Sequence, residues 1–123
     1  MRYRAVLGTS VSDIRTVTVG SVIEQPGTVA VAGSLDSELG CGGDWDPACD
    51  QAQMTFDDAS QTWILEVADL PTGEYEYKAA LDRSWDENYG AGGAPNGSNI
   101  ALRHAGGAIT FVYDHRTNVT GTR

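Results

Sequence analysis

The chain alternates most regularly between polar and apolar side chains over Glu74-Tyr75-Glu76-Tyr77-Lys78-Ala79-Ala80-Leu81. The two tyrosines, Ala79 and Leu81 fall on one face of this run, and the glutamates and Lys78 fall on the other. A period of two is typical of a half-buried β-strand, because successive side chains of a strand point to opposite faces. The preceding Pro71-Thr72-Gly73 is a turn sequence, so we predict a strand that begins just after it.

The other apolar stretches share this short period, and none has the spacing of an amphipathic helix. They cover residues 16–19, 29–33, 53–56, 63–67, 99–102 and 108–113. The small residues of 29–33 predict a strand that is buried on both faces. Turn residues separate the stretches at intervals of roughly 8–12 residues. We therefore predict an all-β, antiparallel sandwich of about seven short strands, with any helix confined to turns.

A chain of 123 residues has room for one domain around one core. We place a boundary at Gln25-Pro26-Gly27. Residues 1–27 are then an N-terminal arm or a first strand, and residues 28–123 form the sandwich. Charge separates the two parts, because residues 1–27 carry three basic and two acidic residues, whereas residues 28–123 carry five basic and fifteen acidic residues.

The net charge of −9 argues against a nucleic-acid partner, whose phosphates require a basic surface. No window approaches the roughly 18 apolar residues that a membrane span requires. The apolar run at residues 5–7 is too short for a signal peptide. We therefore expect either a piece of a longer exported protein or a protein that reaches its location without such a signal.

The chain has two cysteines, Cys41 and Cys49, separated by a short loop that contains two glycines and a proline. Such a loop closes easily, and we favour a disulfide, which implies an oxidising compartment. The alternative is a zinc site with His104 and His115. Their spacing of eleven residues fits no usual zinc motif.

The three tryptophans stand in different surroundings. Trp63 begins an alternating strand, and we expect it in the core. Trp45 lies between two aspartates inside the cysteine loop, and Trp85 lies in another polar run. An aromatic ring at a polar loop tip is costly to leave in water unless it binds a ligand or folds back over the core.

Several short motifs, in this order, resemble the ancillary β-sandwich modules that are appended to bacterial pullulanases and amylases. They are Val31-Ala32-Gly33-Ser34-Leu35, Glu38-Leu39-Gly40, Gly43-Asp44-Trp45-Asp46-Pro47, Gly73-Glu74-Tyr75-Glu76-Tyr77-Lys78, Ser84-Trp85-Asp86-Glu87-Asn88-Tyr89-Gly90 and Tyr113-Asp114-His115-Arg116-Thr117. The resemblance extends over about residues 29–118 and implies an immunoglobulin-like sandwich associated with starch binding.

The arrangement is also similar, more distantly, to glucoamylase-type starch-binding domains. In those domains a Gly-Asp-Trp loop, the lysine of a Glu-Tyr-Lys strand and a later loop tryptophan form one sugar site. The resemblance implies that Trp45, Lys78 and Trp85 bind glycan here, and two indoles set at an angle would match a curved α-1,4-glucan. The polar residues after Trp85 are candidates for further contacts: Asp86, Glu87 and Asn88 for hydrogen bonds, and Tyr89 for a longer platform.

Carboxylates are plentiful in the predicted loops: Asp44, Asp46, Asp50, Asp82, Asp86 and Glu87. A glycosidase needs two of them facing each other across a cleft, which a single small sandwich rarely encloses. The first three do not have the EF-hand spacing of a calcium loop. We therefore predict no catalytic residue, no metal and no cofactor.

Two functions fit these observations. The first is a non-catalytic module that binds α-glucan (starch, glycogen or pullulan) outside the cell, as part of a larger enzyme. The second is a decoration protein on a phage capsid, whose residues 1–27 dock on the shell while the sandwich is displayed on the virion surface. In either case residues 1–27 are a candidate contact with a protein partner, the capsid or the parent enzyme.

Overall fold

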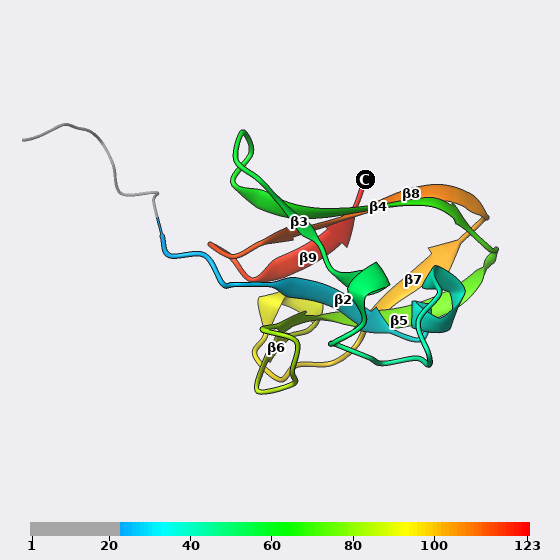
Figure 1. Cartoon of the computed structure of the whole chain (residues 1–123), viewed down its shortest axis with the longest axis horizontal. Helices are drawn as coiled ribbons and strands as arrows, with labels where there is room; N and C mark the ends of the chain where they lie inside the picture. Colours follow the sequence, from blue (N-terminus) through cyan, green and yellow to red (C-terminus); the bar gives the residue numbers. More distant parts are fainter. Residues whose placement is uncertain (1–22) are drawn as a thin grey trace, which may run out of the picture.

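The structure is a computed structural model, and it describes residues 23–123. The expected strand at residues 16–19 and most of the expected arm lie outside the described residues. Residues 23–123 form eight strands in two antiparallel sheets that face each other (Figure 1). The predicted all-β sandwich is therefore confirmed.

The first sheet is built around β5 (Gly73–Leu81). Strand β2 (Val29–Gly33) pairs with β5 along one edge, from Val29 opposite Leu81 to Gly33 opposite Tyr77. Two strands share the other edge of β5: β7 (Ile100–His104) pairs with its first half, and β6 (Glu87–Tyr89) pairs with its end. The strand predicted after residue 73 is therefore confirmed, and the structure places it at the centre of a sheet.

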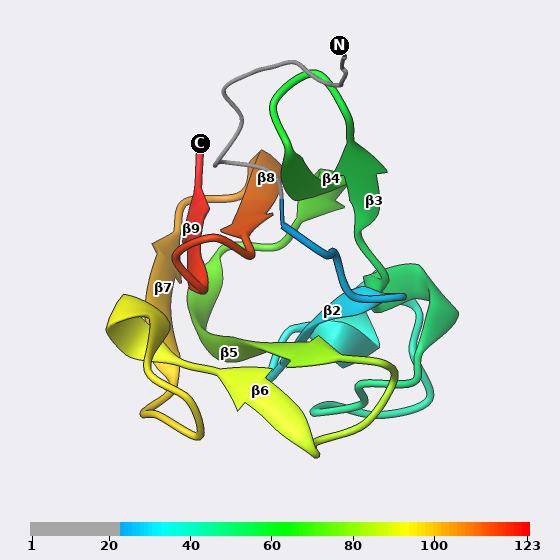
Figure 2. The ribbon, with the colours of Figure 1, turned by 90° about the vertical axis from the view of Figure 1, so that its left-hand side faces the viewer.

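The second sheet has the order β3-β4-β8-β9. Its strands are β3 (Thr55–Asp57), β4 (Thr62–Leu70), β8 (Gly107–Asp114) and β9 (Val119–Thr122). Figure 2 shows this sheet above β2, β5 and β6, with β7 at the side. Helical structure within residues 23–123 consists of three short 3₁₀ turns, Asp36–Leu39, Asp50–Ala52 and Ala91–Gly93, and no helix there is long and apolar enough to cross a membrane.

The core lies between the two sheets. Tyr77 of β5 meets Phe111 of β8 edge to face, with ring centroids 5.1 Å apart. Trp63 is 6% exposed, as predicted for a core residue, and its indole N–H donates to the side-chain oxygen of Gln25 at 3.0 Å. All five residues of β2 are buried, which confirms that this strand is covered on both faces.

The segment from Ser34 to Met54 runs past the end of β2 and returns to its outer edge. The backbone N–H of Trp45 donates to the carbonyl of Gly33 at 2.9 Å, and that of Met54 donates to the carbonyl of Val29 at 2.7 Å. A Cβ atom at Gly33 would lie 2.1 Å from the carbonyl oxygen of Glu76, so only glycine allows this close approach. This course of the segment places the tryptophan loop, residues 41–49 with Trp45, beside the outer face of β5.

Candidate functional site

The loop that carries Trp45 is closed by a disulfide. The sulfur atoms of Cys41 and Cys49 are bonded, with their Cα atoms 5.8 Å apart, which confirms the predicted bond. It uses both thiols that the zinc alternative required, so that alternative is wrong. A covalent ring of this size limits the shapes of the loop and reduces the entropy that is lost when its tip is ordered.

A buried carboxylate holds the base of the same loop. Asp36 is 0% exposed, and its Oδ2 accepts hydrogen bonds from the backbone N–H groups of Gly33 at 3.3 Å and Asp46 at 3.0 Å. Its Oδ1 is buried without a partner among the described residues. Burial raises the pKa of Asp36 to about 6, even though the two N–H donors oppose the shift.

The raised pKa predicts a pH-dependent stability. In the unfolded chain this carboxyl titrates near its ordinary value of 3.8. The stabilisation from protonating Asp36 is therefore fully present below about pH 4 and is lost as the pH rises through about 6. We expect urea unfolding to show about 1 kcal/mol more stability at about pH 5 than at about pH 7.5 from this residue.

The control for that prediction is Asp36→Asn, which keeps an oxygen for the two N–H donors and cannot ionise. The variant is expected to lose this part of the pH dependence, while all other titrating groups remain. An unchanged pH profile in Asp36→Asn would show that Asp36 does not titrate in this range.

Trp45 and Trp85 lie side by side although forty residues separate them in the chain. Their ring centroids are 6.4 Å apart and their planes are inclined by 42°. Trp45 is half-buried, and Trp85 is 39% exposed. Both rings are therefore on the surface, and the structure joins the two loop tryptophans into one angled pair.

Arg83 connects the two loops. Its guanidinium group donates to the carbonyl of Ala48 at 2.7 Å and to the carboxylate of Asp50 at 2.6 Å. The Arg83 side chain is 45% exposed and that of Asp50 is 81% exposed, so the contribution of this ion pair to stability is small. Its role is positional, because it holds the turn before Trp85 against the disulfide loop. Sequence reasoning missed this contact, and the opposite charges next to the two tryptophan motifs are the only signal for it.

Lys78 lies on the outer face of β5, on the same side as Glu76. It pairs across the sheet with Ala32, the neighbour of Gly33, whose carbonyl accepts the N–H of Trp45. Within residues 23–123 its ammonium group forms no ion pair. Lys78 therefore adds three donors to the face that carries the tryptophan loop.

The residues after Trp85 do not act as one group. Asp86 is exposed beside the ring. Asn88 is only 6% exposed, and its amide donates to the carbonyl of Trp85 at 2.8 Å and to the side chain of Asn96 at 3.0 Å. The expectation that Asn88 hydrogen-bonds a ligand is corrected here, because its donors are used in holding the backbone of Trp85.

Tyr89 turns away from the proposed platform. It pairs with Ala79, a core residue, so its ring points to the inner face of the sheet, opposite to Lys78. There it stacks on Tyr113 with centroids 6.3 Å apart, and its hydroxyl bonds to Glu87. This bond raises the pKa of Tyr89 to about 12. Tyr89 therefore does not extend the platform, and Glu87 is engaged with it.

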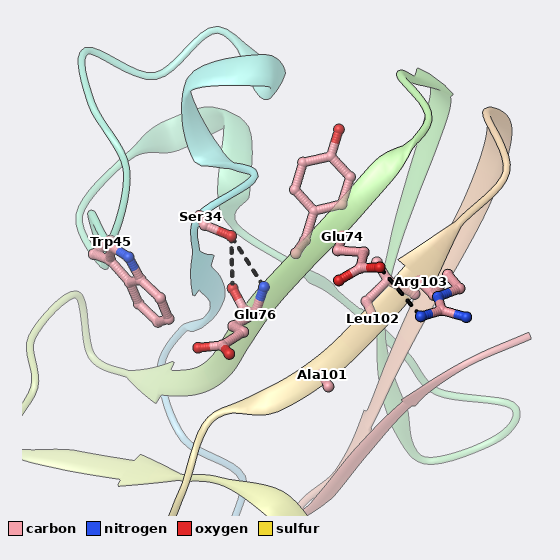
Figure 3. A pocket seen from close by; sticks show the side chains of 8 residues that line it. Ser34, Trp45, Glu74, Glu76, Ala101, Leu102 and Arg103 are labelled. Carbon is pink, nitrogen blue, oxygen red and sulfur yellow. Dashed lines mark hydrogen bonds and ion pairs between the residues drawn. The ribbon is translucent and has the colours of Figure 1, made fainter.

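A hollow of about 480 Å³ adjoins Trp45 on the outer face of β5 and β7 (Figure 3). Besides Trp45, it is lined by residues of the segment after β2 and of these two strands: Ser34, Glu74, Tyr75, Glu76, Ala101, Leu102 and Arg103. Sequence reasoning did not identify it, because the pairing of β5 with β7 could not be read from either strand alone.

Comparison with known proteins gives matches over most of the residues that the structure describes. The family model described as the pullulanase X25 domain matches residues 28–120. An amylopullulanase of Thermoanaerobacterium thermosulfurigenes is 42% identical over 89 residues, and one of Thermoanaerobacterium saccharolyticum is 43% identical. Each match covers 72% of this chain but only 5% and 7% of the two relatives.

A solved structure agrees with these matches. The pullulanase from Bacillus acidopullulyticus aligns with 80% of this chain and 11% of its own, with 31% identity and a TM-score of 0.66. The predicted resemblance to pullulanase-associated modules is thus confirmed. Since the family model covers most of the sequence, this chain belongs to the pullulanase X25 domain family.

Proposed function

We propose that this domain is a non-catalytic module that binds α-glucan on its paired indoles. The observation that carries the proposal is the surface pair of Trp45 and Trp85, inclined by 42°. The C–H faces of glucose are apolar and gain free energy when they cover an indole. Successive rings of an α-1,4-glucan turn relative to one another, so an angled pair of indoles suits them better than a flat row.

The surroundings of the pair support the same ligand. The Lys78 ammonium and the exposed Asp86 carboxylate provide a donor and an acceptor for sugar hydroxyls. The disulfide, the Asp36 carboxylate and the Arg83 contacts order the two loops before a ligand arrives. Such preorganisation lowers the cost of binding, and a site of this size is expected to have a Kd of roughly micromolar to millimolar.

The biological setting is part of the proposal. The matched relatives are named amylopullulanases, and the chain spans a small fraction of their length. We infer that the module works outside the cell as one part of such an enzyme and holds it on its polysaccharide. These relatives give no support to the alternative of a capsid decoration protein.

Affinity electrophoresis tests the proposal. In gels that contain amylopectin, glycogen or pullulan, the wild-type domain is expected to move more slowly than in a gel without polysaccharide. Trp85→Ala is expected to restore normal mobility, because it removes the more exposed indole. Val119→Ala is the matched control, since Val119 is 43% exposed on the other sheet. Equal mobility of the wild type in all gels would contradict the proposal.

A further inference from the structure

The hollow beside Trp45 has the size and the polarity of a sugar subsite. Its volume of about 480 Å³ lies within the range of roughly 300–1,000 Å³ that is typical of small-ligand sites. Figure 3 shows Trp45 at one end and the Glu74–Arg103 pair at the other, with Ala101 between them on β7. Ala101 pairs with Glu76 across the sheet, so their side chains lie on the same face, and the small side chain of Ala101 leaves this space open.

The polar side chains that line the hollow have donors and acceptors that are not used within residues 23–123. Glu76 accepts one bond from the Asn99 amide at 2.9 Å through Oε1, which leaves Oε2 free among the described residues. Arg103 uses one of its N–H groups on Glu74 at 3.2 Å, and both side chains are largely exposed. A guanidinium group has five N–H donors, so several remain for hydroxyl groups.

The hollow lies directly beside the indole pair, and this position indicates which ligand it binds. Trp45 is one of the two paired indoles and also lines the hollow. A glucan chain that extends beyond the pair at the Trp45 end therefore meets the hollow next. We propose that the hollow binds the next glucosyl units of the same α-glucan chain, so that the site extends from Trp85 across Trp45 to Arg103. This inference rests on the proposed function and adds to it a second subsite that selects for long chains.

Calorimetric titration with maltotriose and maltoheptaose tests this subsite. A longer ligand can occupy the indole pair in several registers, so tighter binding of maltoheptaose alone is not sufficient evidence. The decisive variant is Ala101→Ile, which adds bulk to the β7 side of the hollow, leaves both tryptophans in place and suits a strand position. It is expected to weaken maltoheptaose binding about tenfold and to change maltotriose binding less than about twofold.

Two further variants complete the design. Ala108→Ile places the same side chain at an exposed position of β8 on the other sheet and is expected to change neither affinity. Arg103→Ala is expected to weaken maltoheptaose selectively, as Ala101→Ile does, and thermal unfolding confirms that each variant is folded. Unchanged maltoheptaose affinity in folded Ala101→Ile and Arg103→Ala would overturn the subsite alone. Failure of the wild type to bind either ligand would overturn the proposed function as well.

Discussion

Trp45→Ala is expected to lower the affinity for maltoheptaose by about 30-fold or more, which is the loss that corresponds to about 2 kcal/mol for a central aromatic anchor. The reason is its double position, since the ring is half of the indole pair and one wall of the hollow. Trp85 belongs only to the pair, so Trp85→Ala is expected to weaken maltoheptaose less than Trp45→Ala does. Calorimetric titration measures both variants.

The loop of residues 41–49 is expected to keep its conformation in Trp45→Ala. The hydrogen bond from residue 45 to Gly33 uses the backbone N–H, and neither the disulfide nor the hydrogen bond from Asp46 to Asp36 involves an atom of the indole. Trp45 has a left-handed backbone, with φ of 58°, a strain that alanine shares. Trp45→Phe serves as the control and is expected to recover part of the affinity. Normal affinity in a folded Trp45→Ala would remove the basis of the proposed site.

Phe111→Ala is expected to reduce the free energy of unfolding by about 3–5 kcal/mol, the cost of emptying a fully buried aromatic site. Phe111 is 0% exposed, and its ring meets Tyr77 of the opposite sheet at 5.1 Å. The lost contact therefore lies between the two layers. Urea unfolding followed by tryptophan fluorescence measures the change. Since domains have only about 5–15 kcal/mol of stability, the variant is expected to be close to unfolding at 37 °C.

The neighbouring residue is the control. Val112 follows Phe111 in β8 and therefore points to the outer face, where it is half-buried. Val112→Ala is expected to cost about 1 kcal/mol or less, because its side chain is not enclosed by the opposite sheet. Similar losses for the two variants would mean that the layers are not packed through Phe111 as described.

Parts of the site that depend on neighbouring residues in the chain could be predicted from the sequence. Cys41 and Cys49 close a loop of fixed length around Trp45, and such a loop has few other ways to fold. The outward direction of Lys78 follows from its place in an alternating strand. By contrast, the directions of Asn88 and Tyr89 were predicted incorrectly, because a polar run after a loop does not reveal that a short strand begins at Glu87.

Most of the strands, the side chains of β5 that face outward and the loop that a disulfide closes could be read from the sequence, whereas β6 and β9 could not. A period of two and a short loop are local properties, so they can be read without knowing what lies next to them. The folded arrangement alone brings Trp45 to Trp85, joins their loops through Arg83, and pairs β5 with β7 to form the hollow. These features depend on strand partners and register, which are set by the packing of the whole domain.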